Sequence, residues 1–175
     1  MTPEDAVAGA LEPRGTGPVS VLDALRAFGG DTGALAAAAG VSRRTVQRWA
    51  RGARGLGGEV RGLKRPAALA GPLRRAAIHD LAAALRRRGG TVQFSGEIRI
   101  SETVYATAFE LDLRGSDLED TANALDTAAD SDGDLGAPAV VAALSGDLIA
   151  GWDHKGTVTA VASLGEVDEL GVTPR

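Results

Sequence analysis

The sequence predicts an α+β protein, with an N-terminal all-α helix-turn-helix domain followed by a small β-β-α-α-β domain. Apolar residues recur at helical spacing over 18–28, 32–49 and 72–88, and they alternate with polar residues over 91–100 and 103–113. The charge changes at the same place: residues 1–90 hold 15 Lys and Arg against 7 Asp and Glu, net +8, whereas residues 91–175 hold 4 against 16, net −12. We therefore expect a flexible leader over residues 1–17, a helix-turn-helix domain over 18–88 and an acidic α+β domain over 91–175.

The leader carries prolines and glycines without any periodicity, which is typical of a flexible segment. Pro18 to Phe28 then predicts a scaffold helix that ends at Gly29-Gly30. Its expected apolar face consists of Val21, Leu22, Leu25 and Phe28.

The segment from Asp31 to Gly52, DTGALAAAAGVSRRTVQRWARG, has the pattern of a helix-turn-helix. We expect a first helix from about Thr32 to Ala39, followed by Gly40, because the turn requires a residue that tolerates positive φ. Ser42 is a good N-cap for the second helix. On this helix Val46 and Trp49 are expected to face the core, leaving an outward face of Ser42, Arg43, Arg44, Gln47 and Arg48.

This outward face predicts a recognition helix in the major groove of double-stranded DNA, because Arg pairs with guanine and Gln with adenine. The alternative is an ordinary αα-hairpin with a solvated basic face. Ala36, which stands four residues before Gly40, and an inward Val41 favour the helix-turn-helix.

A basic segment and an Arg-rich helix complete the first half. Residues 50–66 combine five Gly with five Arg or Lys, which predicts a basic loop along DNA phosphates or, equally well, a solvated linker. Pro72 to Arg88 predicts a helix with an apolar stripe of Leu73, Ala77, Ile78, Leu81 and Leu85. Further candidate DNA contacts are Arg51, Arg54, Lys64, Arg65, Arg74 and Arg75.

The second half predicts two strands, two helices and a final strand. Strands over 91–100 and 103–113 form a hairpin across Ser101-Glu102. Ser116 begins a capping box that opens a helix, which is followed by a turn at 130–134, a helix over 138–152 and a strand over 157–164 with an acidic tail. The inward residues of the first of these helices are expected to be Leu118, Ala122, Leu125 and Ala129.

So small a sheet is often completed by pairing between two copies. We expect a homodimer formed through residues 91–175, using exposed strand edges and an apolar helix face around Leu144 and Leu148.

Several classes of site are disfavoured. There is no cysteine, and His79 and His154 stand far apart, so we expect no metal and no cofactor. His79 is expected to be packed or at the surface. Neither a phosphate-binding glycine loop nor a nucleophile–His–acid set occurs, so we do not expect an enzyme acting on small molecules. No membrane span or signal peptide is visible, which predicts a cytoplasmic, nucleoid-associated protein.

The chain resembles the terminal proteins of actinomycete linear chromosomes and plasmids. The similarity is closest over GVSRRTVQRW, Gly40 to Trp49, and the basic stretch with Arg65-Pro66, whereas beyond Gly89 only the order and size of the elements match. The resemblance implies binding at the ends of a linear replicon, together with a telomere-binding protein and a DNA polymerase.

Proteins of that family cap 5′ DNA ends through a hydroxyl side chain. The resemblance would offer Thr103, Tyr105 and Thr107, but nothing in the local sequence selects one, and all three fit ordinary strand residues. We assign no catalytic residue. The alternative function is a transcriptional regulator or repressor of phage or plasmid type, whose acidic domain dimerises or receives a signal.

Overall fold

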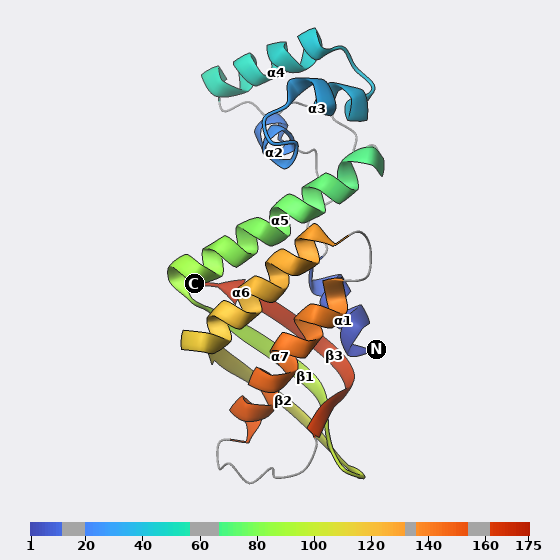
Figure 1. Cartoon of the computed structure of the whole chain (residues 1–175), viewed down its shortest axis with the longest axis vertical. Helices are drawn as coiled ribbons and strands as arrows, with labels where there is room; N and C mark the ends of the chain where they lie inside the picture. The colour runs from blue at the N-terminus through green and yellow to red at the C-terminus, as the bar shows by residue number, and fades with distance from the viewer. Residues whose placement is uncertain (12–19, 57–66, 132–135, 154–161) are drawn as a thin grey trace. The chain divides into compact units, whose positions relative to one another are not determined.

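A computed structural model of the protein describes residues 1–11, 20–56, 67–131, 136–153 and 162–175. Within these residues the protein is mixed α+β, with seven helices and a three-stranded antiparallel sheet (Figure 1). The chain divides into two compact units, one of residues 13–77 and one of residues 1–12 together with 78–175. The first holds 12 Lys and Arg against 3 Asp and Glu, net +9, and the second holds 7 against 20, net −13. We call them the basic unit and the acidic unit.

The basic unit packs α2 (Val21–Ala27), α3 (Thr32–Ala39), α4 (Arg43–Leu56) and the beginning of α5 (Ala67–Arg88) around one small core. The buried residues of this core are Val21, Ala24, Leu25, Leu35, Ala36, Val46, Ala50 and Leu69. The predicted face of α2 was wrong at Leu22, which is 42% exposed, because Ala24 takes the inward position.

Two helices of the basic unit are longer than expected. α4 continues to Leu56 where a loop was predicted from Ala50, because Ala, Arg and Leu are strong helix formers that offset a cost of about 1 kcal/mol for each glycine. α5 begins at Ala67 instead of Pro72. Leu69 is completely buried in this first turn, and the free energy gained from its burial offsets the loss of the hydrogen bond that Pro72 cannot donate.

The apolar stripe of α5 is shared between the two cores. Leu69 and Leu73 pack in the basic unit, whereas Ile78, Ala82 and Leu85 are buried in the acidic unit. The division between units therefore falls after Ala77, inside this helix, and differs from the expected boundary at Gly89-Gly90.

In the acidic unit, β1 (Gly90–Ile100) is the central strand of the order β2-β1-β3. β2 (Thr103–Leu113) forms the predicted hairpin with β1, since Ile100 pairs with Thr103 across Ser101-Glu102. The predicted alternation is confirmed, because Val92, Phe94 and Ile98 are buried.

β3 (Ala162–Pro174) differs from the expected final strand. Most of the predicted strand over 157–164 lies outside the described residues, and the expected acidic tail is itself the strand. Its pairing with β1 shifts register on both sides of Gly96, so the period-two pattern is broken and hides the strand. A Cβ on Gly96 would stand 2.5 Å from the carbonyl oxygen of Glu166, which explains the glycine at this close approach.

α6 (Gly115–Asp130) and α7 (Gly136–Trp152) lie across one face of the sheet (Figure 1). Ala122, Leu125 and Ala129 are buried as predicted, and Leu118 is half-buried. The capping box was wrong: Arg114 is the N-cap without a side-chain hydrogen bond, and Ser116 bonds Asp117 instead.

The expected dimerisation face of α7 is inside the protein. Leu144 is 1% exposed and Leu148 is 0% exposed, because both side chains belong to the core of the acidic unit. These two leucines are therefore not available for contact with a partner.

The expected flexible leader was wrong over α1 (Pro3–Ala10). Thr2 caps this helix, Pro3 stands in its first turn, and Ala6, Val7 and Leu11 are buried against β3 and α7. The backbone N–H of Val167 donates to the carbonyl of Met1 at 2.9 Å, so this segment is tied to β3. None of the described helices is long and apolar enough to cross a membrane.

Candidate nucleic-acid interface

The turn between α3 and α4 is built as the sequence predicts. Gly40 takes the left-handed conformation, with φ 66° and ψ 30°. The N–H of Val41 donates back to the carbonyl of Ala36 at 3.0 Å. Ser42 Oγ then accepts the N–H of Thr45 at 3.2 Å, which satisfies a donor of the first turn of α4. The turn thereby sets the start of α4 relative to α3.

α4 has one buried and one exposed face. Val46 is 0% exposed and Ala50 8% exposed, whereas Trp49 is half-buried. The side chains predicted to point outward are all exposed: Ser42, Arg43, Arg44, Gln47 and Arg48. Arg51, which was expected in a loop, is also exposed on this helix. The structure therefore brings six of the predicted site residues together on one helical surface.

Two of these arginines are bound within the protein. Arg43 Nε donates to Thr32 Oγ1 at 3.1 Å, which links the start of α4 to the start of α3, and Arg51 Nε donates to the carbonyl of Gln47 at 3.3 Å. Within the described part of the chain, Arg44 and Arg48 have neither hydrogen bond nor ion pair. The local sequence pattern does not distinguish Arg43 from Arg44 and Arg48, because a hydrogen bond across 11 residues has no local signature.

The start of α3 already holds an anion. Asp31 Oδ1 accepts the N–H groups of Gly33 at 2.7 Å and Ala34 at 3.2 Å. These backbone hydrogen bonds lower the pKa of Asp31, and the charge of Arg43 adds to the effect. We therefore place the candidate phosphate and base contacts on α4 and not at this helix end.

Of the remaining predicted DNA contacts, the structure describes only two. The side chain of Arg54, and Lys64 and Arg65, lie outside the described residues. Arg74 is half-buried and Arg75 is exposed, both on α5.

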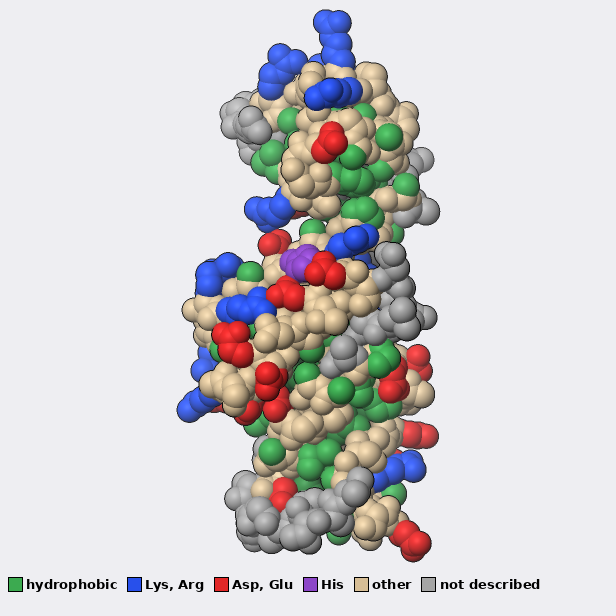
Figure 2. All heavy atoms as spheres, viewed as in Figure 1, with side chains coloured by type: hydrophobic (Ala, Val, Ile, Leu, Met, Phe, Trp, Pro, Cys, Tyr) green, Lys and Arg blue, Asp and Glu red, His purple; other side chains and the backbone are tan. Residues whose placement is uncertain are grey.

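Figure 2 displays the charge on one face of the molecule. Lys and Arg side chains project from the basic unit, and Asp and Glu side chains are spread over the visible face of the acidic unit. A polyanion would be attracted to the first surface and repelled by the second.

Both ring nitrogens of His79 form hydrogen bonds to aspartate side chains. Its Nδ1 lies 2.7 Å from Asp126 Oδ1 and its Nε2 lies 3.2 Å from Asp130 Oδ1, and Arg86 Nη1 donates to Asp126 Oδ2 at 2.7 Å. The hydrogen bond with Asp126 is the main cause that raises the pKa of His79. With neither nitrogen open, His79 serves to tie α5 to α6. His154 lies outside the described residues.

The three hydroxyl candidates lie on β2. Thr103 and Tyr105 are exposed and Thr107 is half-buried, while the Tyr105 ring packs on Trp152 at 5.2 Å between centroids. Among the described residues none of the three has a hydrogen-bonded acid or base. Their placement therefore does not select any of the three as a priming hydroxyl.

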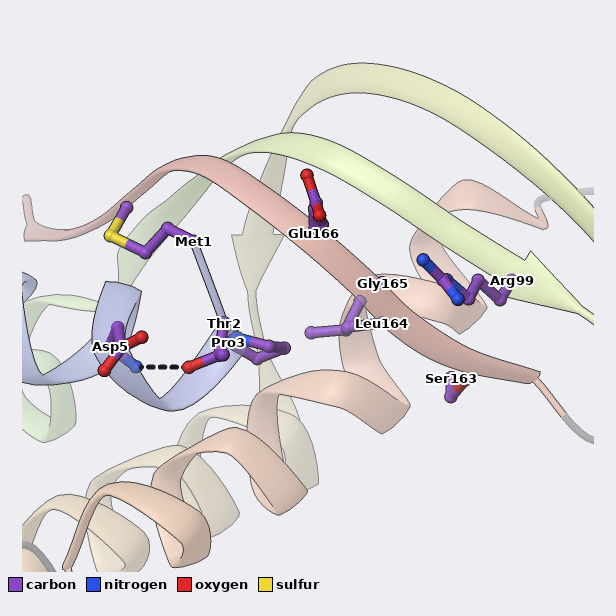
Figure 3. Close-up of a pocket in the computed structure, with 9 residues that line it drawn as sticks. All are labelled: Met1, Thr2, Pro3, Asp5, Arg99, Ser163, Leu164, Gly165 and Glu166. Carbon is purple, nitrogen blue, oxygen red and sulfur yellow. Dashed lines mark hydrogen bonds between the residues drawn. The ribbon is translucent and has the colours of Figure 1, made fainter.

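A shallow pocket of about 510 Å³ in the acidic unit was not predicted (Figure 3). It lies between the start of α1, where Thr2 Oγ1 accepts the N–H of Asp5, and the beginning of β3. Its cation, Arg99, donates to Glu97 Oε2 at 3.1 Å and is thereby neutralised. We assign no ligand to this pocket, because its polar groups do not converge on one point.

No protein-family model, curated protein or solved structure matches the chain.

Proposed function

We propose that this protein binds double-stranded DNA in a sequence-specific manner, with α3 and α4 acting as a helix-turn-helix. The observation that carries the proposal is the exposed face of α4, where Arg44, Gln47 and Arg48 stand together on a helix anchored by Val46 and Ala50. An α-helix fits the major groove, and these side chains match the donors and acceptors of guanine and adenine.

The arginines divide into two roles in this proposal. Arg44 and Arg48 contact DNA, with Gln47 between them on the same face. Arg43 holds the start of α4 against Thr32 and acts as a positioning residue. The net charge of +9 on the basic unit supplies the long-range attraction to phosphates.

For the process served, we propose a terminal protein at the ends of a linear replicon, acting with a telomere-binding protein and a DNA polymerase. The support is the resemblance over Gly40 to Trp49. Covalent priming would require a hydroxyl, for which Thr103, Tyr105 and Thr107 remain the candidates.

The alternative is a transcriptional regulator or repressor. A single helix-turn-helix reads only a few base pairs, so a regulator generally uses two copies on an inverted repeat. The regular outer edge of β2, on which a second copy can pair, favours this alternative. A binding site selected from random DNA separates the two: an inverted repeat indicates a regulator, and a strict requirement for a duplex end indicates a terminal protein.

The DNA-binding proposal is tested with the double substitution Arg44→Ala and Gln47→Ala in the full chain. We expect loss of specific binding to a selected site, since each bidentate base contact discriminates by about 1–3 kcal/mol. The matched control is Arg87→Ala with Gln93→Ala, which removes the same residue types from exposed positions of the acidic unit. Electrophoretic mobility shifts with specific and scrambled duplexes provide the measurement. Equal affinity of the double variant and the parent for the selected site would contradict the assignment of α4.

A further inference from the structure

We propose that two copies of this chain pair through β2, edge to edge and antiparallel, about a two-fold axis at Ala108. The paired sheets would form one six-stranded sheet with the order β3-β1-β2-β2-β1-β3. This inference is independent of the proposed function, because it concerns how the acidic unit assembles and not what α4 binds.

β2 is an edge strand without a bulge, a proline or a basic side chain. Among the described residues no strand pairs with its outer side, so a row of backbone N–H and C=O groups faces outward along 11 residues. Its pairing with β1 is continuous from Thr103 to Leu113 without a bulge, and this span contains neither Lys, Arg nor Pro. Long, regular edges of this kind are templates for pairing with another strand.

The opposite edge strand of the same sheet, β3, is protected against pairing with another strand. β3 carries register shifts against β1, exposed Glu166, Asp168 and Glu169, and a proline at its end. Its Val167 N–H is already bonded to Met1. Bulges, charges and proline are the devices that block edge pairing. β3 combines all three, whereas β2 has neither a bulge nor a proline and carries only the charges of Glu110 and Asp112.

Side-chain burial along β2 also fits an additional strand. On the face toward α6 and α7, Phe109 and Leu111 are only half-buried and Tyr105 is 42% exposed. On the open face, Ala106 and Ala108 are small and exposed. A second β2 beside the first would cover Tyr105, Phe109 and Leu111 with the same side chains of the partner copy.

The two-fold axis at Ala108 follows from the register. It places Tyr105 opposite Leu111 of the partner copy and Thr107 opposite Phe109, so apolar side chains meet over the helix-covered face. On the open face Ala106 stands opposite Glu110, and Ala108 stands opposite itself. Each carboxylate of β2 therefore faces an uncharged residue.

Charge complementarity then distinguishes this register from its neighbours. Just beyond the strand ends, exposed Arg114 stands opposite exposed Glu102 of the partner copy, and the two-fold axis repeats this pair. Within its own chain Arg114 Nη2 donates to Asp112 Oδ2 at 2.7 Å, so Glu102 of the partner copy would share this guanidinium with Asp112. An axis at Thr107 would place Glu102 opposite Asp112, and an axis at Ala106 would place it opposite Glu110. An axis at Glu110 would oppose that carboxylate to itself. Like charges directly opposite destabilise a sheet. An axis at Phe109 would oppose no like charges, but it would place Arg114 opposite Val104 and Glu102 opposite Ser116, without an attractive pair. The axis at Ala108 is therefore favoured.

The first experiment is cysteine cross-linking of the full chain, which contains no native cysteine. Ala108→Cys places two thiols opposite each other at a Cα separation of about 4.5–5.5 Å, within the range of a disulfide. The matched control is Ala106→Cys, on the same open face, whose partner residue would stand four positions away, about 13 Å along the strand. We expect a covalent dimer on mild oxidation of Ala108→Cys and little from Ala106→Cys. Equal cross-linking of the two variants would overturn the register.

The second experiment exchanges the terminal charges and measures the dimer dissociation constant by sedimentation. Glu102→Arg should weaken dimerisation roughly tenfold, because two attractive pairs become repulsive. Glu102→Arg combined with Arg114→Glu should restore it to within a few-fold of the parent. A full chain that remains monomeric at tens of micromolar, or a dimer that responds to neither change, would overturn the proposal.

Discussion

At the scale of single residues, Asp147 is the clearest case of a side chain perturbed by its surroundings. It lies on α7 beside Thr121, which is 0% exposed and donates its hydroxyl to Asp147 Oδ2 at 3.5 Å. Desolvation is the main cause that raises the pKa of Asp147 to about 6, and the charges of Asp117 and Asp120 add to it.

This raised pKa predicts that Asp147→Asn stabilises the acidic unit at neutral pH. The folded protein binds a proton at Asp147 that the unfolded chain has released above a pKa of 3.8, so stability falls as the pH rises from about 4 to about 6 and stays lowered above that. We expect a gain of about 1–2 kcal/mol at pH 7.5 and none at pH 3.5, discounted for the partial exposure of the carboxyl. Urea unfolding at the two pH values measures it.

The control for this prediction is Asp168→Asn, which removes the same charge from an exposed position of β3. Its effect on stability should be within about 0.5 kcal/mol at both pH values. If Asp147→Asn behaved in the same way, the carboxyl would be as well solvated as that of Asp168.

Residue-level features were predictable from the sequence where they depend on neighbours along the chain. Gly40, Ser42 and Val46 take their predicted positions because turn geometry, capping and helical spacing are local. The bonds of Arg43 to Thr32 and of His79 to Asp126 were not predictable, since they join residues 11 and 47 positions apart and depend on tertiary packing.

At the scale of elements, the turn between α3 and α4 depends on the backbone of one glycine. A Cβ on Gly40 would meet no atom within 4 Å, so the only obstacle to a side chain is the φ of +66°. Gly40→Ala should therefore destabilise the basic unit by about 1–2 kcal/mol through the left-handed conformation alone. Fluorescence of Trp49 during urea unfolding, in a Trp152→Phe background, reports on this unit.

Gly52 supplies the matched control for Gly40. It lies within α4, is exposed, and would also accept a Cβ without any atom within 4 Å, but its backbone is helical. Gly52→Ala should stabilise the same unit by about 0.5–1 kcal/mol, because alanine is the better helix former. Equal effects of the two substitutions would show that the conformation of Gly40 is not a constraint.

Regular elements were predicted best and irregular ones worst. The β1–β2 hairpin has the expected strands because its alternation is unbroken, whereas the bulge opposite Gly96 concealed β3 inside an apparent acidic tail. α1 was not predicted because Pro3 and Gly9 suggested a loop. Thr2 as an N-cap and the helical spacing of Ala6, Val7 and Leu11 are nevertheless the sequence signals of this helix.

At the scale of the whole molecule, charge follows the structural units more closely than it follows the linear halves of the sequence. The values of +8 and −12 predicted for the halves become +9 and −13 for the units. The sequence could not place the boundary inside α5, because the helical stripe runs without interruption through Ala77. A fragment ending at Gly90 would keep Ile78 and Leu85 without their core, so the charge division is best tested in the full chain.

The division of charge predicts which arginines set the salt dependence of DNA binding. Each phosphate neutralised by a cation contributes about −0.9 to the slope of log K against log salt concentration. Arg48→Ala, on the exposed face of α4, should therefore make the slope less steep by about 0.9. Arg99→Ala removes an exposed charge from the acidic unit and should leave the slope unchanged. Fluorescence anisotropy with a non-specific duplex between 50 and 200 mM salt, roughly the range in which such slopes are resolved, makes the comparison. If the two variants shifted the slope equally, phosphate contacts would extend to the acidic unit, and the assignment of DNA binding to α4 and its unit would have to be withdrawn.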